Sequence, residues 1–176
     1  MRALVVYESM FGNTEAVARA IADGLRGEMD VDLREVSRAP APVTDLVDLI
    51  VVGGPTHAFS MTRPSTRAQA LIQGATHGKQ DIGLREWLNH LRSGPHSELV
   101  AAFDTRVDKA RWLPGSAAKK AAKVAHDLGY TPAGRQSYYV ADTSGPLMPG
   151  ELDRAEAWGR ELATAMAARA RGRHVS

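Results

Sequence analysis

Three short segments carry the side chains of this sequence that could do chemistry. Each follows an apolar run and combines polar donors with glycine or an aromatic ring: SMFGNT at 9–14, GGPTHAF at 53–59 and FDTRVDKARWLPGS at 103–116. Hydroxyl and backbone N–H groups at the beginning of a helix bind anionic oxygen atoms. An aromatic side chain beside such donors suits a flat heterocycle. Binding of a phosphate and of a flat ring is therefore the chemistry open to these segments.

The first segment joins an apolar strand to a helix. Ser9 and Thr14 supply hydroxyl donors, Asn13 supplies an amide, and Gly12 allows close approach of the backbone. The segment has no lysine, so it is not a Walker loop for a triphosphate, and a monophosphate held by neutral donors is favoured. Taken alone, it also fits an ordinary helix capped by Thr14 or Asn13.

The second segment begins with two glycines that end a predicted strand, and Pro55 then stiffens the turn. Thr56 and His57 supply polar groups, and Phe59 supplies an aromatic face. Phe59 either contacts a ring or simply covers the core. His57 is also the best candidate for an acid or base in the chain.

The third segment leaves a predicted strand with Asp104, Thr105 and Arg106, and it reaches Trp112 before the next helix. Trp112 either stacks on a ring or covers the edge of the sheet. Arg106 either meets a ligand oxygen or pairs with a surface carboxylate such as Asp108.

The apolar pattern predicts the elements that position these segments. Five segments are predicted as buried strands: Ala3–Tyr7, Val31–Val36, Leu49–Val52, Leu99–Phe103 and Ser137–Val140. The second alternates and is typical of an edge strand. Helical periodicity covers Val17–Leu25, Leu84–Leu91, Ala117–Leu128 and Glu151–Ala168, with Ser65–Ile72 as a further candidate. This alternation predicts an α/β fold with a doubly wound, five-stranded parallel sheet and helices on both faces. Ligands bind at the carboxyl ends of such strands, where the three segments lie.

Composition narrows the class of protein. The 176 residues suffice for one domain, there is no cysteine, and no apolar run approaches the roughly 20 residues of a membrane-spanning helix. The net charge is +2, but without the three arginines of the C-terminal end 19 basic and 20 acidic residues remain. We therefore expect a cytoplasmic domain over residues 1–168, a basic disordered tail over 169–176, and no nucleic-acid partner.

Three other site classes find little support in the residues. The histidines at 57, 77, 90 and 96 lack metal-ligand spacing on one element, and no HExxH motif accompanies them. No GxSxG elbow is present, which argues against a serine hydrolase. A receiver domain needs an acidic cluster after the first strand and an aspartate after the third, whereas the sequence has only Glu8 and GGPTH there.

In this context SMFGNT resembles the FMN phosphate loop of the flavodoxin-like family, in which Ser9, Gly12 and Thr14 match the family pattern. DLIVVGGPTHAF, LVAAFDT with LPGSAAKKAAKVAHDLGY, and ELDRAEAWGREL resemble later parts of that family. The resemblance implies a strand order of 2-1-3-4-5, noncovalently bound FMN and a redox function. It places the phosphate on Ser9, Met10, Phe11, Gly12, Asn13 and Thr14. It places the ring between two loops, with Phe59 or Trp112 stacked on it: Pro55, Thr56, His57, Ala58 and Phe59 in one, Asp104, Thr105, Arg106 and Val107 in the other.

Departures from the family pattern bear on function. Phe11 stands where a hydroxyl residue is common, and residues 56–59 lack the glycine often found in electron shuttles. Shuttle flavodoxins are usually acidic, whereas this chain is not. A cation at Arg106 beside the ring would raise the two-electron potential.

The sequence therefore predicts an FMN-binding electron-transfer protein with a redox partner that the sequence does not identify. An FMN-dependent oxidoreductase acting on a quinone or porphyrinogen is the first alternative. A flavin-free binding module on the same fold is the second. The segment Ser60–Asp81 is either a lid or partner surface, or a plain loop with one short helix.

Overall fold

The computed structural model describes residues 1–43 and 46–173. One sheet organises the chain, with parallel strands in the order β2-β1-β3-β5-β6 and β4 paired antiparallel to the end of β3. The strands are β1 (Arg2–Tyr7), β2 (Asp30–Glu35), β3 (Leu49–His57), β4 (Ser60–Met61), β5 (Leu99–Val107) and β6 (Thr131–Val140). The doubly wound fold and the order of its five parallel strands are confirmed, and β2 lies at the predicted edge.

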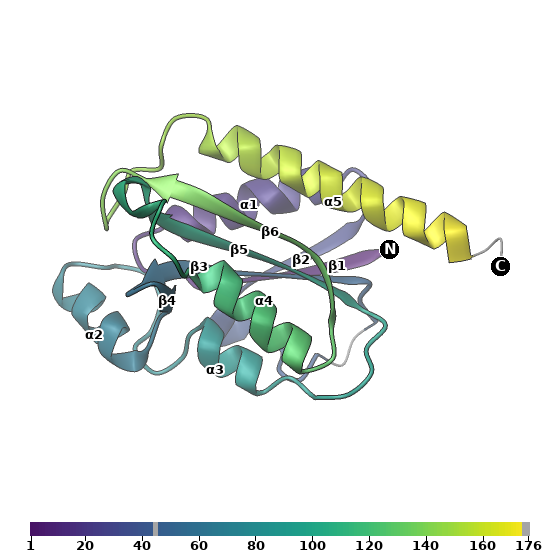
Figure 1. The fold of residues 1–176 in the computed structure, drawn as a ribbon, viewed down its shortest axis with the longest axis horizontal. Coiled ribbons are helices and arrows are strands. Elements are labelled where there is room, and N and C mark those ends of the chain that lie inside the picture. The colour runs from purple at the N-terminus through teal and green to yellow at the C-terminus, as the bar shows by residue number, and fades with distance from the viewer. Residues whose placement is uncertain (44–45, 174–176) are drawn as a thin grey trace.

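Helices cover both faces of this sheet (Figure 1). They are α1 (Asn13–Leu25), α2 (Pro64–Ile72), α3 (Leu84–Asn89), α4 (Ala117–Asp127) and α5 (Glu151–Arg173), with short 3-10 turns at Val36–Arg38 and Asp108–Ala110. Helices α1 and α5 pack together on one face, where Ile21, Phe103 and Trp158 belong to the core. Helices α3 and α4 pack on the other face, around Ile50 and Trp87.

Strands β3, β5 and β6 are several residues longer than predicted, and β3 is longer because glycine does not end it. Gly53 and Gly54 continue the strand and pair with Phe103 and Asp104 of β5. A Cβ atom on Gly53 would lie 2.0 Å from Cζ of Phe103, so the phenyl ring occupies the space that glycine leaves. β3 therefore runs on to His57, and β5 extends beside it to Val107. β6 is longer at its amino end instead, where Thr131–Gln136 lie beside Leu99–Phe103 of β5.

The C-terminal helix also exceeds its prediction. The boundary expected at residue 168 lies inside α5, and residues 169–173 are helical, so the prediction of disorder is wrong for them. Alanine and arginine, which dominate this stretch, are strong helix formers. Residues 174–176 lie outside the described residues. Within the described part of the chain, no helix has both the length and the apolarity to cross a bilayer.

Candidate functional site

The segment 9–14 begins helix α1 without a side-chain cap. Gly12 is the N-cap residue in the left-handed conformation, with φ 88°, and no side chain accepts from the first-turn N–H groups. The alternative interpretation, a helix capped by Thr14 or Asn13, is therefore wrong. Ser9 instead stabilises the turn, because its Oγ accepts the N–H of Gly12 at 3.1 Å. The first turn of α1 keeps its backbone donors available for an anion.

Side chains of this segment also connect it to two other strand ends. The buried hydroxyls of Thr14 and Thr105 lie 2.7 Å apart and share a hydrogen bond. Nδ2 of Asn13 donates to the carbonyl of Ser144 at 3.0 Å, in the loop after β6. The beginning of α1 is thus held against the carboxyl ends of β5 and β6.

The segment after α2 packs against the same turn. The N–H of His77 donates to the carbonyl of Met10 at 3.1 Å. A Cβ atom on Gly78 would lie 2.7 Å from Sδ of Met10, and one on Gly12 would lie 3.4 Å from Cε1 of His77. Part of the Ser60–Asp81 segment therefore packs against the turn at residues 9–14. The helix predicted at Ser65–Ile72 is present as α2.

The second segment forms a tight hairpin between β3 and β4. Ala58 and Phe59 both have positive φ, 48° and 62°, which is uncommon for two successive residues with side chains. Thr56 faces α4, since its Oγ1 donates to Oδ2 of Asp104 at 3.0 Å and accepts the N–H of Ala117 at 2.8 Å. Asp104 is fully buried and caps α4 through the N–H of Ala118, so its carboxylate is a helix cap.

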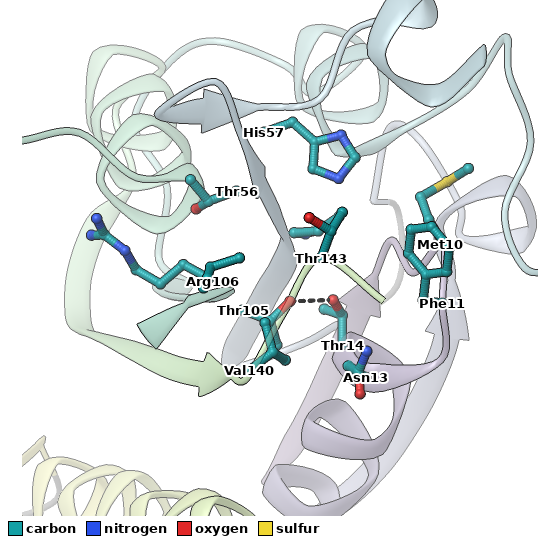
Figure 2. A pocket seen from close by; sticks show the side chains of 12 residues that line it. Met10, Phe11, Asn13, Thr14, Thr56, His57, Thr105, Arg106, Val140 and Thr143 are labelled. Carbon is teal, nitrogen blue, oxygen red and sulfur yellow. Dashed lines mark hydrogen bonds between the residues drawn. The ribbon is translucent and has the colours of Figure 1, made fainter. Parts of the chain in front are cut away.

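Arg106 does not pair with Asp108, and its guanidinium is held by its own loop. Its guanidinium Nη2 donates to the carbonyls of Ala110 and Leu113 at 2.5 and 3.1 Å, which clamps the loop that follows β5. Asp108 pairs instead with Arg111, with Nη2 and Oδ1 2.5 Å apart. Arg106 is only 8% exposed, and Figure 2 shows its guanidinium pointing away from Thr14 and Thr105.

These elements enclose a pocket of about 70 Å³ at the carboxyl end of the sheet. A second hollow of about 250 Å³ adjoins it against α2 and shares Thr56, His57 and Thr143 with it. The pocket is lined by ten of the predicted site residues and by two that were missed: Met10, Phe11, Asn13, Thr14, Pro55, Thr56, His57, Thr105, Arg106 and Val107, with Val140 and Thr143 (Figure 2). Val140 ends β6 and Thr143 follows it, and the carboxyl end of this predicted strand was the signal that the sequence offered for them.

Six predicted residues do not line this pocket. Ser9 and Gly12 shape the turn behind it, Asp104 caps α4, and Ala58 lines the second hollow. Phe59 is 52% exposed and turns toward α4, and Trp112 is 86% exposed. Neither aromatic residue covers the core or the sheet edge, and Phe11 and His57 provide the rings that face the pocket.

Two titratable groups near the pocket have perturbed pKa values. Burial, and secondarily the positive charge of Arg67, lower the pKa of His57, so its imidazole is neutral at pH 7. Burial raises the pKa of Glu8, which follows β1. Glu8 accepts from Thr62 Oγ1 at 2.5 Å and from the N–H of Leu84 at 2.8 Å, so it ties β1 to β4 and α3.

Arg67 of α2 completes this buried network. Its side chain is inaccessible, donates to Thr62 Oγ1 at 2.8 Å and to the carbonyl of Gln80 at 2.7 Å, and pairs with Glu86 at 3.0 Å. Because a buried cation needs several partners, α2 and the segment after it are held firmly to the sheet.

This doubly wound sheet, with a pocket at the carboxyl ends of its strands, is a flavodoxin-like fold. Residues 5–82 match the flavodoxin family model. The fold resembles a flavodoxin from the domain Archaea, with 20% identity, TM-score 0.63 and coverage of 95% of this chain and 99% of that chain. It also resembles a *Streptococcus pneumoniae* TIGR4 flavodoxin at 18% identity, with TM-score 0.64 and coverage of 94% and 99%. Oxidised flavodoxin 1 from *Bacillus cereus* is 16% identical, with TM-score 0.64 and coverage of 93% and 98%. A comparison with curated proteins gave no significant match.

The match of residues 5–82 to the flavodoxin model makes FMN the group to compare with this pocket. The residues present fit that group. The uncapped first turn of α1 offers backbone donors to a phosphate, and Thr14 adds a hydroxyl beside it. Apart from Arg106, the rest of the lining is uncharged and partly apolar, as a flat aromatic ring requires.

Proposed function

We propose that this protein binds FMN across the carboxyl ends of β1, β3 and β5 and transfers electrons to and from a partner. The observation that carries the proposal is the uncapped beginning of α1, which opens its backbone donors beside a pocket lined by three strand ends. When bound, FMN supplies the redox chemistry, because its ring accepts and releases electrons.

The chain's own residues would bind and orient the cofactor. The N–H groups of Asn13 and Thr14 would hold the phosphate, and the hydrogen bond to Thr105 would fix the Thr14 hydroxyl toward it. The hairpin at 55–59 and the strand end at 104–107 would hold the ring. Phe11 and neutral His57 are the aromatic groups available to it in the pocket, and Phe59 and Trp112 could contact only its outer edge.

A second candidate is an FMN-dependent oxidoreductase acting on a small molecule of the quinone or porphyrinogen class. The hollow against α2 favours it, because it adjoins the pocket and presents hydrogen-bonding groups without charge, among them Thr66, Gln69 and Gln73. Such a lining suits the carbonyl groups of a neutral substrate. His57 would donate or accept a hydrogen bond there.

An FMN titration of the purified protein tests the proposal. We expect saturable quenching of flavin fluorescence at one FMN per chain. Absence of binding would overturn the proposal and leave a flavin-free binding module on this fold. The loaded protein then separates the two redox candidates. A carrier exchanges electrons with a redox protein at a rate that Gln69→Ala and Gln73→Ala leave unchanged, whereas an oxidoreductase turns over a quinone at a rate that these substitutions reduce.

A further inference from the structure

A basic surface covers the outer side of α4 and the adjoining part of β6. We call it the α4 basic face, and its five cationic or titratable residues are Lys119, Lys120, Lys123, His126 and Arg135. All five are exposed. They line a hollow of about 490 Å³ that also contains the apolar side chains of Phe59, Ala122 and Pro132. Cationic side chains therefore surround a hollow whose lining is partly apolar.

Most of this charge is not neutralised within the chain. Lys123 pairs with Asp127, with Nζ and Oδ2 2.8 Å apart, and Nδ1 of His126 lies 3.8 Å from the same carboxylate. Within residues 1–43 and 46–173, no carboxylate lies within ion-pair distance of Lys119, Lys120 or Arg135. Three unpaired cations and one shared aspartate leave the face with a clear positive excess.

The α4 basic face begins where the candidate FMN pocket ends. The hairpin after β3 places His57 in the pocket and Phe59 in the hollow beside α4. The loop after β5 meets that hairpin closely, since a Cβ atom on Gly115 would lie 2.6 Å from the carbonyl oxygen of Phe59. The same loop exposes Trp112 and Leu113, at 86% and 47%. Phe59 thus lies at the end of the α4 basic face nearest the pocket, and the loop that contacts it exposes further apolar side chains.

We propose that the α4 basic face, with Phe59 at its pocket end, docks an acidic surface of a partner protein. Lysines around exposed aromatic side chains match the usual build of a transient interface, in which apolar groups contact and charges steer the approach. Docking at this face does not itself depend on the proposed function. The inference rests on that function only for what docking would achieve, because a partner docked here would lie beside the pocket.

The distribution of charge favours a protein surface over a small anion. The cations on α4 run from residue 119 to residue 126, about 10 Å along a helix at 1.5 Å per residue. They are exposed, and the hollow contains no buried charged group on which a small anion could converge. A row of mobile lysines instead complements an extended acidic surface.

A binding experiment with a defined probe tests this proposal. The probe is a fluorescently labelled peptide of eight glutamates around a central tryptophan, and its anisotropy is followed as protein is added. We expect saturable binding that weakens steeply with salt, since the Debye length falls from about 30 Å at 0.01 M to about 3 Å at 1 M. The double variant Lys119→Glu/Lys120→Glu should weaken binding by about tenfold or more.

A matched control changes the same charge elsewhere. Arg169→Glu/Arg171→Glu alters two exposed arginines of α5, a helix on the other side of the sheet (Figure 1), and should change affinity by less than about twofold. Equal losses in both double variants would overturn the proposal, because binding would then follow net charge alone. Phe59→Ser should weaken the peptide further by removing the apolar contact.

Two further results separate this proposal from its alternatives. Citrate that displaces the peptide and binds as tightly as the peptide does would identify a small-anion site and overturn the docking proposal. FMN titration of Lys119→Glu/Lys120→Glu should match the wild type. Peptide binding without FMN binding would overturn the proposed redox function alone, and FMN binding without peptide binding would overturn the docking surface alone.

Discussion

The hydroxyl of Thr14 lies 2.7 Å from that of Thr105, although 91 residues separate them in the chain. Thr14 belongs to the first turn of α1, and Thr105 lies near the end of β5. Their hydrogen bond is buried, and it joins the turn at residues 9–14 directly to β5, which forms another wall of the pocket. The shape of the pocket therefore depends on a contact that neither segment makes alone.

Replacing either threonine with valine should lower the free energy of unfolding by a similar amount. Each single variant leaves one buried hydroxyl without its partner, so we expect a loss of about 1 kcal/mol in the free energy of unfolding. The double variant Thr14→Val/Thr105→Val should cost less than the sum, because no unpaired hydroxyl remains. Urea unfolding of the four proteins measures this coupling, and strictly additive losses would contradict it. FMN affinity should fall more for Thr14→Val, since only Thr14 lies at the helix start.

Gly12→Ala should weaken FMN binding through the backbone of the turn. Gly12 has φ 88°, a conformation that costs a residue with a Cβ roughly 1 kcal/mol or more. The new methyl group would also lie 3.4 Å from the ring of His77. Gly94→Ala is a control, because Gly94 has φ 140°, no atom within 4 Å of an added Cβ, and a hydrogen bond to the carbonyl of Leu128 after α4 rather than to the turn. Both variants should lose stability in urea unfolding, but only Gly12→Ala should raise the FMN dissociation constant; equal affinities would argue against the phosphate role of the turn.

The doubly wound parallel sheet could be predicted from the sequence, because strand segments alternate with helical periodicity. Its strand order came instead from the resemblance of the loops to the flavodoxin-like family. Strand lengths could not be predicted. Gly53 and Gly54 resemble a strand end, and only the position of Phe103 on the neighbouring strand explains why glycine is needed inside β3. The hairpin strand β4 has two residues and leaves no periodic signal.

The candidate site was predictable at the level of segments rather than side chains. Ten of sixteen named residues line the pocket, because the carboxyl ends of parallel strands converge in any such fold. The direction of Arg106 was not predictable, since its partners are carbonyl oxygens of its own loop, and carbonyls carry no sequence signal. The roles of Asp104 and Thr56 as caps of α4 likewise depend on packing between distant segments.

Arg106→Lys should loosen the loop at 108–113 although it keeps the positive charge. Both carbonyls accept from one nitrogen, Nη2, which the rigid guanidinium plane holds in place, whereas the ammonium of lysine ends a flexible chain. We therefore expect faster amide hydrogen exchange in this loop for Arg106→Lys and for Arg106→Met, measured without flavin. Lys109→Met is the control, because Lys109 is exposed on the same loop and its loss changes the net charge equally. Unchanged exchange in Arg106→Lys would show that charge, and not the clamp, is what matters at this position.

Glu8 and His57 should make stability depend on pH in opposite directions. The pKa of Glu8 is raised by burial, so its contribution is fully present below its unfolded value of 4.5 and is lost as pH rises through the folded pKa. The free energy of unfolding of wild type minus that of Glu8→Gln should therefore fall as pH rises from 4.5. Urea unfolding at several pH values measures this difference, and a difference independent of pH would contradict the buried environment of Glu8.

His57 has the opposite sign. Its pKa is lowered by burial and by Arg67, so its contribution is present above the unfolded value of 6.5 and is lost as pH falls through the folded pKa. The free energy of unfolding of wild type minus that of His57→Gln should accordingly fall as pH drops below 6.5. His90→Gln is a suitable control, because His90 is exposed and should leave the pH dependence unchanged. If His57→Gln and wild type instead keep parallel stability curves between pH 5 and 8, the imidazole is as accessible to protons in the folded protein as in the unfolded chain, and its role as a neutral group in the pocket fails.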